Sequence, residues 1–337
     1  MKTCNTSWWR RVAIGVMSVA MGIVIGGCGS SAPTNEGKLP VVASVYPVYD
    51  VAKQVGGDKI ALTLLVPPGS EPHDWEPSSS DLMAIGKAKL FLYNGAGLEP
   101  TEKIVTKDVL RDAKAIELSK AVRVLPMPHE DSEGEMAKES APSAVDKSAD
   151  GHDHEHGSND HEHGSNDPHV WLDPTNVMLE TDAVVKAFSE ADPANAEYYK
   201  KNGEAYKEKL AKLDAQYQDW AQGVQQKNLV VTHEAFGYLA HRYGLHQLGI
   251  MGISPDAEPT PEKMARIVAF VKANGVKAIF SEELVNPKLA EAIAKEAGVT
   301  VYMLNPVEGL TKEQMDKGAT YLSVMEENLA TLKKAMP

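Results

Sequence analysis

A short apolar run followed by a helix that ends at glycine recurs along this chain. The run VVASVY at residues 41–46 predicts a buried strand, and the helical segment after it stops at Gly56. In the second half, LVVT at 229–232 precedes a helix that stops at Gly244. Strands that alternate with helices form parallel sheets with helices on both faces. The pattern therefore predicts an α/β fold of two lobes, each with its own parallel βα sheet.

The same cues place the remaining elements. Further strands are expected at residues 61–66, 90–93, 115–118, 248–253, 277–281 and 300–304. Helices are expected at residues 48–55, 82–88, 235–243, 261–274, 287–297 and, as one last helix, 312–334. Residues 78–81 have the composition of a helix cap.

One long helix is predicted between the two groups of strands. Asp192 and Pro193 open it, because Asp is a good N-cap and Pro is favoured at the first helical position. Large side chains then recur on one helix face: Tyr199, Tyr206, Leu210, Leu213, Tyr217 and Trp220. A helix over residues 193–222 would span ~45 Å, more than one lobe needs. We interpret it as a rigid strut between an N-terminal lobe, 41–192, and a C-terminal lobe, 223–337; a long surface helix is the plainer alternative.

A low-complexity insert occupies residues 127–167 of the first lobe. It contains a tandem repeat, HEHGSND, and its low hydrophobicity predicts disorder. Neutral imidazole is a ligand suited to zinc, copper, nickel and iron. We therefore interpret five histidines of the insert as an auxiliary metal collector: His152, His154, His156, His161 and His163. A spacer whose histidines have no measurable role is the alternative.

The N-terminus has the features of a secretory signal. Three basic residues precede an apolar run at 12–25, which is shorter than the ~20 residues of a membrane-spanning helix. The run ends in Ile-Gly-Gly-Cys, a sequence that resembles a bacterial lipobox. We expect a signal peptide at 1–27, acylation of Cys28 and a tether at 28–40, which would anchor the protein to the cell membrane on its extracytoplasmic side. An ordinary signal with an incidental cysteine is the alternative, and with only Cys4 and Cys28 in the chain no disulfide is expected.

Composition narrows the class of partner. The formal charge is −13, which argues against nucleic acid or an anionic membrane surface as the main partner. A hydrophobic content of 43% with 24% charged residues is that of a globular protein, so most of the chain should fold.

Four potential metal ligands follow expected strands or the insert. They are His73, His169, His233 and Glu308. In open α/β sheets, ligands bind beyond the carboxyl ends of the strands, and two of these residues come from each lobe. Three imidazoles and one carboxylate suit tetrahedral zinc and are acceptable for manganese. Each signal is weak when taken alone, because a single histidine is more often an ordinary surface or core residue.

Several segments together resemble one known family. They are VVASVYP, PPGSEPHDWEPSSSD, LFLYNGAGLEP, DPHVWLDP, VVTHEAFGYLA, SEELVNPKLAEAIAKEAGV and VYMLNPVEGLT. The chain resembles the zinc- and manganese-binding lipoproteins of bacterial ABC importers, of the ZnuA/TroA type, over residues 41–334. The resemblance implies two βα lobes joined by one long helix, with the metal buried between them. It also implies that His73, His169 and His233 are ligands.

The fourth ligand departs from the pattern of many relatives, which have an aspartate where this chain has Asn305. A neutral amide is a poor ligand for a transition metal. Glu308 resembles the glutamate that zinc-binding members use instead, while water or another acid is the alternative. Glu282 is a candidate for orienting a ligand histidine, or is a plain surface acid.

The resemblance implies a monomeric receptor that captures zinc and delivers it to an ABC permease with its ATPase. Zinc is favoured over manganese because nitrogen-rich sites suit zinc and because the insert is typical of zinc-binding members. A manganese receptor is the first alternative. A zinc hydrolase is the second, but it would need an open metal position and a motif such as HExxH, which the sequence lacks, so no catalytic residue is assigned. An adhesin is the third, without an adhesive repeat to support it.

Overall fold

The computed structural model describes residues 37–127, 166–255 and 258–337. The predicted signal peptide, Cys28 and most of the insert lie outside the described residues. So do the five collector histidines, His152, His154, His156, His161 and His163.

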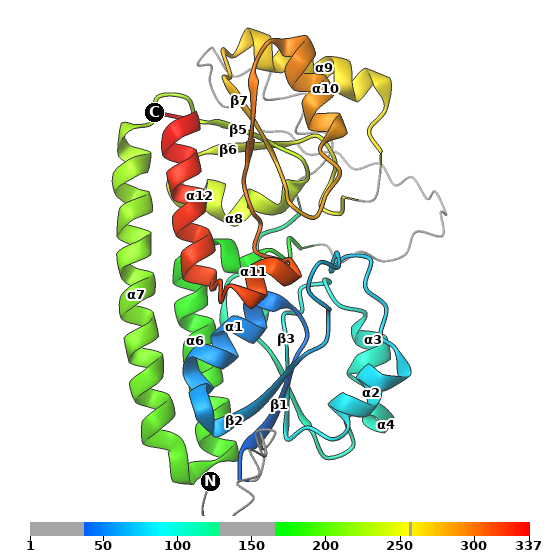
Figure 1. Cartoon of the computed structure of the whole chain (residues 1–337), viewed down its shortest axis with the longest axis vertical. Coiled ribbons are helices and arrows are strands. Elements are labelled where there is room, and N and C mark those ends of the chain that lie inside the picture. Colours follow the sequence, from blue (N-terminus) through cyan, green and yellow to red (C-terminus); the bar gives the residue numbers. More distant parts are fainter. Residues whose placement is uncertain (1–36, 128–165, 256–257) are drawn as a thin grey trace, which may run out of the picture. The chain divides into compact units, whose positions relative to one another are not determined.

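The N-terminal lobe, the lower of the two in Figure 1, is built on a parallel sheet. The order of its strands is β2-β1-β3-β4. Its strands are β1 (Leu39–Ala43), β2 (Ile60–Leu64), β3 (Leu90–Tyr93) and β4 (Lys114–Glu117). Alternate residues of a strand point to opposite faces of a sheet. Accordingly, Val41 and Ala43 join one core cluster, while Val42 joins another under the short helices. Those helices are α2 (Ser79–Ile85), α3 (Thr101–Ile104) and α4 (Lys107–Leu110). The lobe also contains two 3-10 turns, η1 (Gly57–Lys59) and η2 (Ser119–Ala121).

The C-terminal lobe repeats this plan, with the parallel order β6-β5-β7-β8. Its strands are β5 (Asn228–Val231), β6 (His246–Gly249), β7 (Ala278–Ser281) and β8 (Thr300–Met303). Its helices are η5 (Glu234–Phe236), α8 (Gly237–Tyr243), α9 (Pro261–Ala273) and α10 (Lys288–Ala297). The stop predicted at Gly244 is confirmed, because Gly244 has the left-handed φ that ends a helix, and Gly298 ends α10 in the same way. Strand β6 begins and ends earlier than expected at 248–253.

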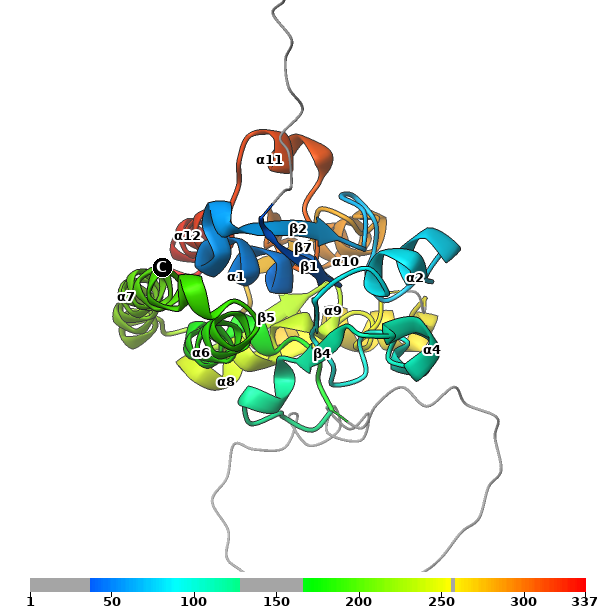
Figure 2. The same cartoon turned by 90° about the horizontal axis from the view of Figure 1, so that it is seen from below.

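Two long helices follow each other along the chain between the strands of the two lobes, and the sequence predicts only the second of them. Helix α7 (Ala196–Gly223) is the predicted strut, but it begins after a 3-10 turn, η4 (Pro193–Asn195). Asp192 is therefore not the cap of α7; its carboxylate accepts hydrogen bonds from Asn195 and Tyr199 instead. A second helix, α6 (Pro174–Ala191), was not predicted and lies alongside α7 (Figure 2).

The prediction of one continuous last helix at 312–334 is wrong. It is two helices, α11 (Lys312–Asp316) and α12 (Tyr321–Ala335). Gly318 has φ +75° in the break, and Thr320 caps α12 with a capping box. Helix α12 packs against α7, where the Tyr217 hydroxyl donates to the Met325 carbonyl.

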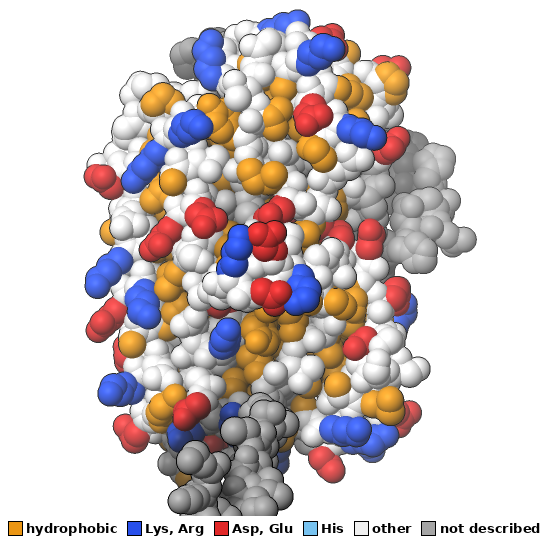
Figure 3. All heavy atoms as spheres, in the orientation of Figure 1, with side chains coloured by type: hydrophobic (Ala, Val, Ile, Leu, Met, Phe, Trp, Pro, Cys, Tyr) orange, Lys and Arg blue, Asp and Glu red, His pale blue; other side chains and the backbone are white. Residues whose placement is uncertain are grey.

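One core cluster extends through both lobes. It joins Val41 and Leu92 of the first sheet to Leu229 and Phe280 of the second. Helix α1 (Tyr46–Gly56) covers the first sheet on this side, and α6, α7, α8 and α12 complete the cluster. None of the helices in the described ranges has the length and apolar character to cross a membrane. The face drawn in Figure 3 carries acidic and basic side chains interspersed.

Candidate metal site

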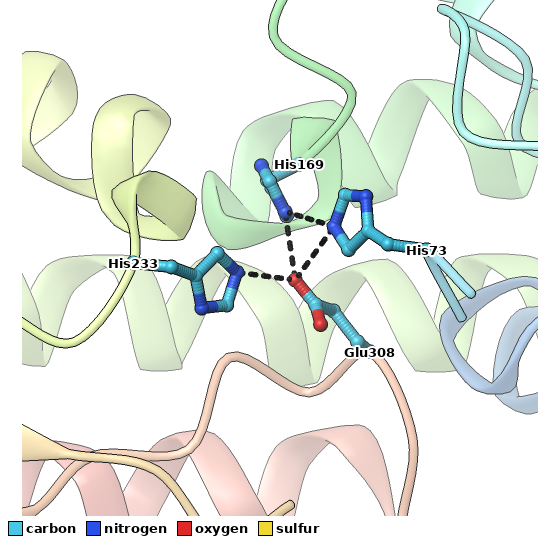
Figure 4. Close-up of side chains that lie close together, drawn as sticks. All are labelled: His73, His169, His233 and Glu308. Atoms are coloured by element: carbon cyan, nitrogen blue, oxygen red, sulfur yellow. Dashed lines mark hydrogen bonds and ion pairs between the residues drawn. The ribbon is translucent and has the colours of Figure 1, made fainter. Parts of the chain in front are cut away.

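The structure brings the four predicted metal ligands together (Figure 4). His73 lies in the loop after β2, His233 lies two residues beyond the end of β5, and Glu308 lies in the loop after β8. His169 immediately precedes a 3-10 turn, η3 (Val170–Leu172), that leads into α6. One nitrogen or oxygen atom of each side chain lies within 4.8 Å of the others. The cluster thus forms from loops of both lobes, as the strand-end argument predicts.

Glu308 lies at the centre of the cluster. Its Oε1 is 2.7 Å from Nε2 of His169, 3.1 Å from Nε2 of His233 and 3.6 Å from Nε2 of His73. The Nε2 atoms of His73 and His169 are 3.2 Å apart, so only one of them carries the proton between them. All three imidazoles therefore present the same nitrogen to one point.

The cluster is buried. The side chains of His169 and His233 are fully buried, Glu308 is 2% exposed and His73 is 9% exposed. Water is therefore largely excluded, which strengthens every electrostatic interaction among these groups.

Two further carboxylates, of Asp167 and Glu282, contact the Nδ1 atoms of His169 and His233. Asp167 Oδ1 lies 2.7 Å from Nδ1 of His169 and accepts the backbone N–H of the same residue at 2.9 Å. Glu282 Oε2 lies 2.6 Å from Nδ1 of His233, and this contact is an ion pair without hydrogen-bond geometry. Glu282 Oε1 accepts the backbone N–H of His233. A carboxylate on Nδ1 leaves Nε2 free for a metal and makes the imidazole a stronger donor.

The carboxylates change the pKa values of the histidines. Burial by itself lowers the pKa of His169, but Asp167 and Glu308 outweigh burial and raise that pKa to about 9. The pKa of His233 is likewise raised well above its ordinary value, because Glu282 and Glu308 outweigh burial. Burial lowers the pKa of His73. In the metal-free protein, protons on imidazole thus supply the positive charge that a cation would supply at the same point.

Asn305 lies outside the cluster, as the resemblance led us to expect. Its Oδ1 accepts the backbone N–H of Val307, its backbone N–H donates to Asn328, and its Nδ2 donates to Glu283. Asn305 therefore shapes the loop that carries Glu308.

Two residues of the site, Asp167 and Glu71, are not predicted from the sequence. Asp167 was assigned to the low-complexity insert, although a carboxylate two residues before a ligand histidine was a usable signal. Glu71 enters the sequence analysis only as part of the segment PPGSEPHDWEPSSSD. Its Oε1 accepts the backbone N–H of His73, and burial together with the charge of Glu308 raises the pKa of Glu71 to about 8.

Three nitrogens and one carboxylate oxygen are a donor set that zinc accepts in tetrahedral geometry. Two parallel α/β lobes that share such a cluster define a class of two-lobed metal-binding proteins. The chain matches the family described as "Zinc-uptake complex component A periplasmic" over residues 41–335, and it belongs to that family.

Two similar proteins support the assignment to this family. The high-affinity zinc uptake system protein ZnuA of Bacillus subtilis is 36% identical over 93% of this chain and 94% of its own length. The zinc-binding lipoprotein AdcA of Streptococcus pneumoniae is 38% identical over 89% of this chain, which spans only 56% of AdcA.

Solved structures have the same fold. The Zn(II)-bound ZnuA-like domain of Streptococcus pneumoniae AdcA is 35% identical, with a TM-score of 0.70 over 89% of this chain and 99% of the domain. The laminin-binding protein Lmb of Streptococcus agalactiae, described as having adhesin and metal transporting activity, is 32% identical with a TM-score of 0.73, over 89% of this chain and 100% of that one.

Proposed function

We propose that this protein is an extracytoplasmic receptor that binds zinc and delivers it to an ABC import permease. The ligands are His73, His169, His233 and Glu308. The observation that carries the proposal is the convergence of one donor atom from each residue within 4.8 Å, on loops from both lobes. Zinc is the cargo of the site.

Zinc is favoured over manganese by the donor set, because imidazole nitrogen suits zinc and manganese prefers carboxylate, carbonyl and water oxygens. Asp167 and Glu282 add to this preference, since each increases the basicity of one imidazole. The zinc-binding names of the relatives support the same choice.

A receptor also explains the site better than a zinc hydrolase does. Catalytic zinc sites usually keep one position for water, with three protein ligands. Four protein ligands leave no such position here. We therefore assign no catalytic residue.

Four parts of the proposal rest on the sequence and on the family, and not on the geometry of the site. Cys28 is acylated and attaches the protein to the cell membrane. The partner is a permease with its ATPase, and the receptor acts as a monomer. The histidines at 152, 154, 156, 161 and 163 collect further metal.

Calorimetric titration of the full chain with zinc and with manganese tests the proposal. We expect tight binding of zinc, weaker binding of manganese, and a loss of at least about 100-fold in zinc affinity in His233→Ala. The matched control is His246→Ala, which removes an exposed histidine on β6 and should change nothing. Equal zinc affinity in the two variants would overturn the assignment of the site. Deletion of residues 128–165 tests the collector, because it should lower the number of weakly bound zinc ions and leave the tight site intact.

A further inference from the structure

Trp171 joins the two loops that carry His169 and Glu308. Its indole Nε1 donates to the Pro306 carbonyl at 2.7 Å. Trp171 lies two residues after His169, and Pro306 lies two residues before Glu308. The hydrogen bond thus connects a ligand loop of the first lobe directly to a ligand loop of the second.

The backbone of Trp171 makes a second connection of the same kind. Its carbonyl accepts a hydrogen bond of 2.7 Å from the hydroxyl of Tyr321, the first residue of α12. Trp171 and Tyr321 are each 1% exposed. Both hydrogen bonds are therefore shielded from water, and a partner left without its bond would cost about 1–3 kcal/mol.

The loop that carries Glu308 depends on such external support. Val307, between Pro306 and Glu308, has φ +62°. A β-branched residue rarely adopts this left-handed conformation, so local preference opposes the loop's shape. The Asn305 side chain holds the Val307 N–H, and Trp171 holds the Pro306 carbonyl just before it. One contact within the loop, from Asn305, and one from Trp171 outside it thus hold the peptide that precedes Glu308.

The Trp171 side chain also contacts one of the ligand residues, His169. Its ring packs edge-on against the His169 imidazole, with 5.5 Å between the ring centroids. One buried side chain therefore contacts a ligand in one lobe and holds the ligand loop of the other.

We propose that Trp171 is a positioning residue that keeps Glu308 in register with His169 and so slows the release of the bound metal. The inference rests on the proposed function, because it needs zinc at the four-residue site. An opening of the lobes that moves the Glu308 loop away from His169 would also have to break the hydrogen bond between Trp171 and Pro306. The bond therefore adds to the barrier to release without touching the metal.

Trp171→Phe tests the proposal, because phenylalanine keeps an aromatic ring and removes the N–H donor. The matched control is Trp220→Phe, since Trp220 is also buried and its indole donates to the Met336 carbonyl at 3.2 Å. Release of one equivalent of zinc from the full chain into excess chelator is followed by stopped flow, and unfolding of each metal-free variant is measured alongside. We expect release at least about fivefold faster in Trp171→Phe than in Trp220→Phe, with similar losses of stability. Equal release rates in the two variants would overturn the proposal.

A second pair of variants tests the same proposal if Trp171→Phe does not fold. Tyr321→Phe removes the hydroxyl that holds the Trp171 carbonyl, and Tyr217→Phe removes a buried hydroxyl that holds the Met325 carbonyl. Faster zinc release in the first alone supports the proposal, and identical release overturns it. The His233→Ala variant separates the two hypotheses. If it retains tight zinc, the proposed site is wrong; if it loses zinc while both aromatic pairs behave alike, only the positioning role is wrong.

Discussion

Asp167 Oδ1 accepts the backbone N–H of His169 and lies 2.7 Å from the Nδ1 atom of the same residue. The carboxylate therefore fixes both the direction of the ring and the nitrogen that faces the cluster. Asp167 also belongs to the base of the insert, where its backbone N–H donates to the Leu125 carbonyl and its own carbonyl accepts from the Tyr238 hydroxyl. The insert thus ends on the residue that orients a ligand.

Asp167→Asn is expected to weaken zinc binding by about 10- to 100-fold, because the amide is neutral and supports the His169 imidazole less well. The dissociation constant is measured by competition with a chelator of known affinity. Asp182→Asn is the control, since Asp182 is an exposed acid on α6 that pairs with Lys207. An unchanged dissociation constant in Asp167→Asn would remove the orienting role.

Zinc affinity should fall as the pH is lowered, and the fall should begin above neutrality. Without metal the pKa of His169 is raised to about 9, because Asp167 and Glu308 outweigh burial. Zinc must displace that proton at any pH below about 9, so each unit of pH costs up to about tenfold in affinity per proton released. Titrations in buffers of different ionisation enthalpy measure the number of protons. Constant affinity from pH 9 to pH 6 would contradict the expectation.

Glu180→Gln should stabilise the protein at pH 8. Glu180 is buried in α6, and burial raises its pKa to about 8 from an ordinary 4.5. The folded protein then holds a proton that the unfolded chain releases, so stability falls as pH rises from about 4.5 to about 8. Glutamine removes this loss, and we expect a gain of about 1–4 kcal/mol at pH 8 and little change at pH 4.

Urea unfolding at both pH values measures this difference. Glu190→Gln is the control, because Glu190 lies on the same helix, is exposed and pairs with Lys114. The same change in stability at pH 4 and pH 8 for Glu180→Gln would show that the charge of Glu180 is not the cause.

Gly203→Ala should destabilise the protein although alanine favours a helix. A Cβ atom at position 203 of α7 would lie 2.5 Å from Cγ2 of Val185, so the glycine allows α6 to approach α7 closely. We expect a loss of about 1–3 kcal/mol in thermal or urea unfolding, from overpacking. Gly223→Ala, at the end of the same helix with open space around it, should be neutral or stabilising. Equal effects at the two positions would argue against close packing at Gly203.

The sequence predicts the parts of this fold that follow from local pattern. Apolar strands and glycine stops give both sheets, and the rule that ligands gather beyond parallel strand ends brings His73 and His233 together. Helix α6 is not predicted because the Asp-Pro cue at its start, Asp173 and Pro174, falls within the segment DPHVWLDP, which the sequence analysis uses only for the family resemblance. The break in 312–334 was missed because Gly318 alone does not exclude a continuous helix.

The orientation of side chains needed coordinates. The sequence does not indicate how Asn305 is held in the loop of Glu308, because its partners Asn328 and Glu283 are brought in by tertiary packing. Nor does the sequence indicate that Val307 has a positive φ. The same holds for Trp171, which reads in the sequence as an ordinary core aromatic.

The spacing of the ligands along the chain links the site to folding. His73 and His169 are 96 positions apart, and His233 and Glu308 are 75 positions apart, so an unfolded chain cannot offer these four donors at once. Zinc at 100 times its dissociation constant would then raise the free energy of unfolding by about 2.7 kcal/mol. A nascent or truncated chain that lacks the segment after β8 also lacks Glu308, so zinc does not stabilise it in this way. Zinc binding at the four-residue site and folding of the native structure are therefore coupled.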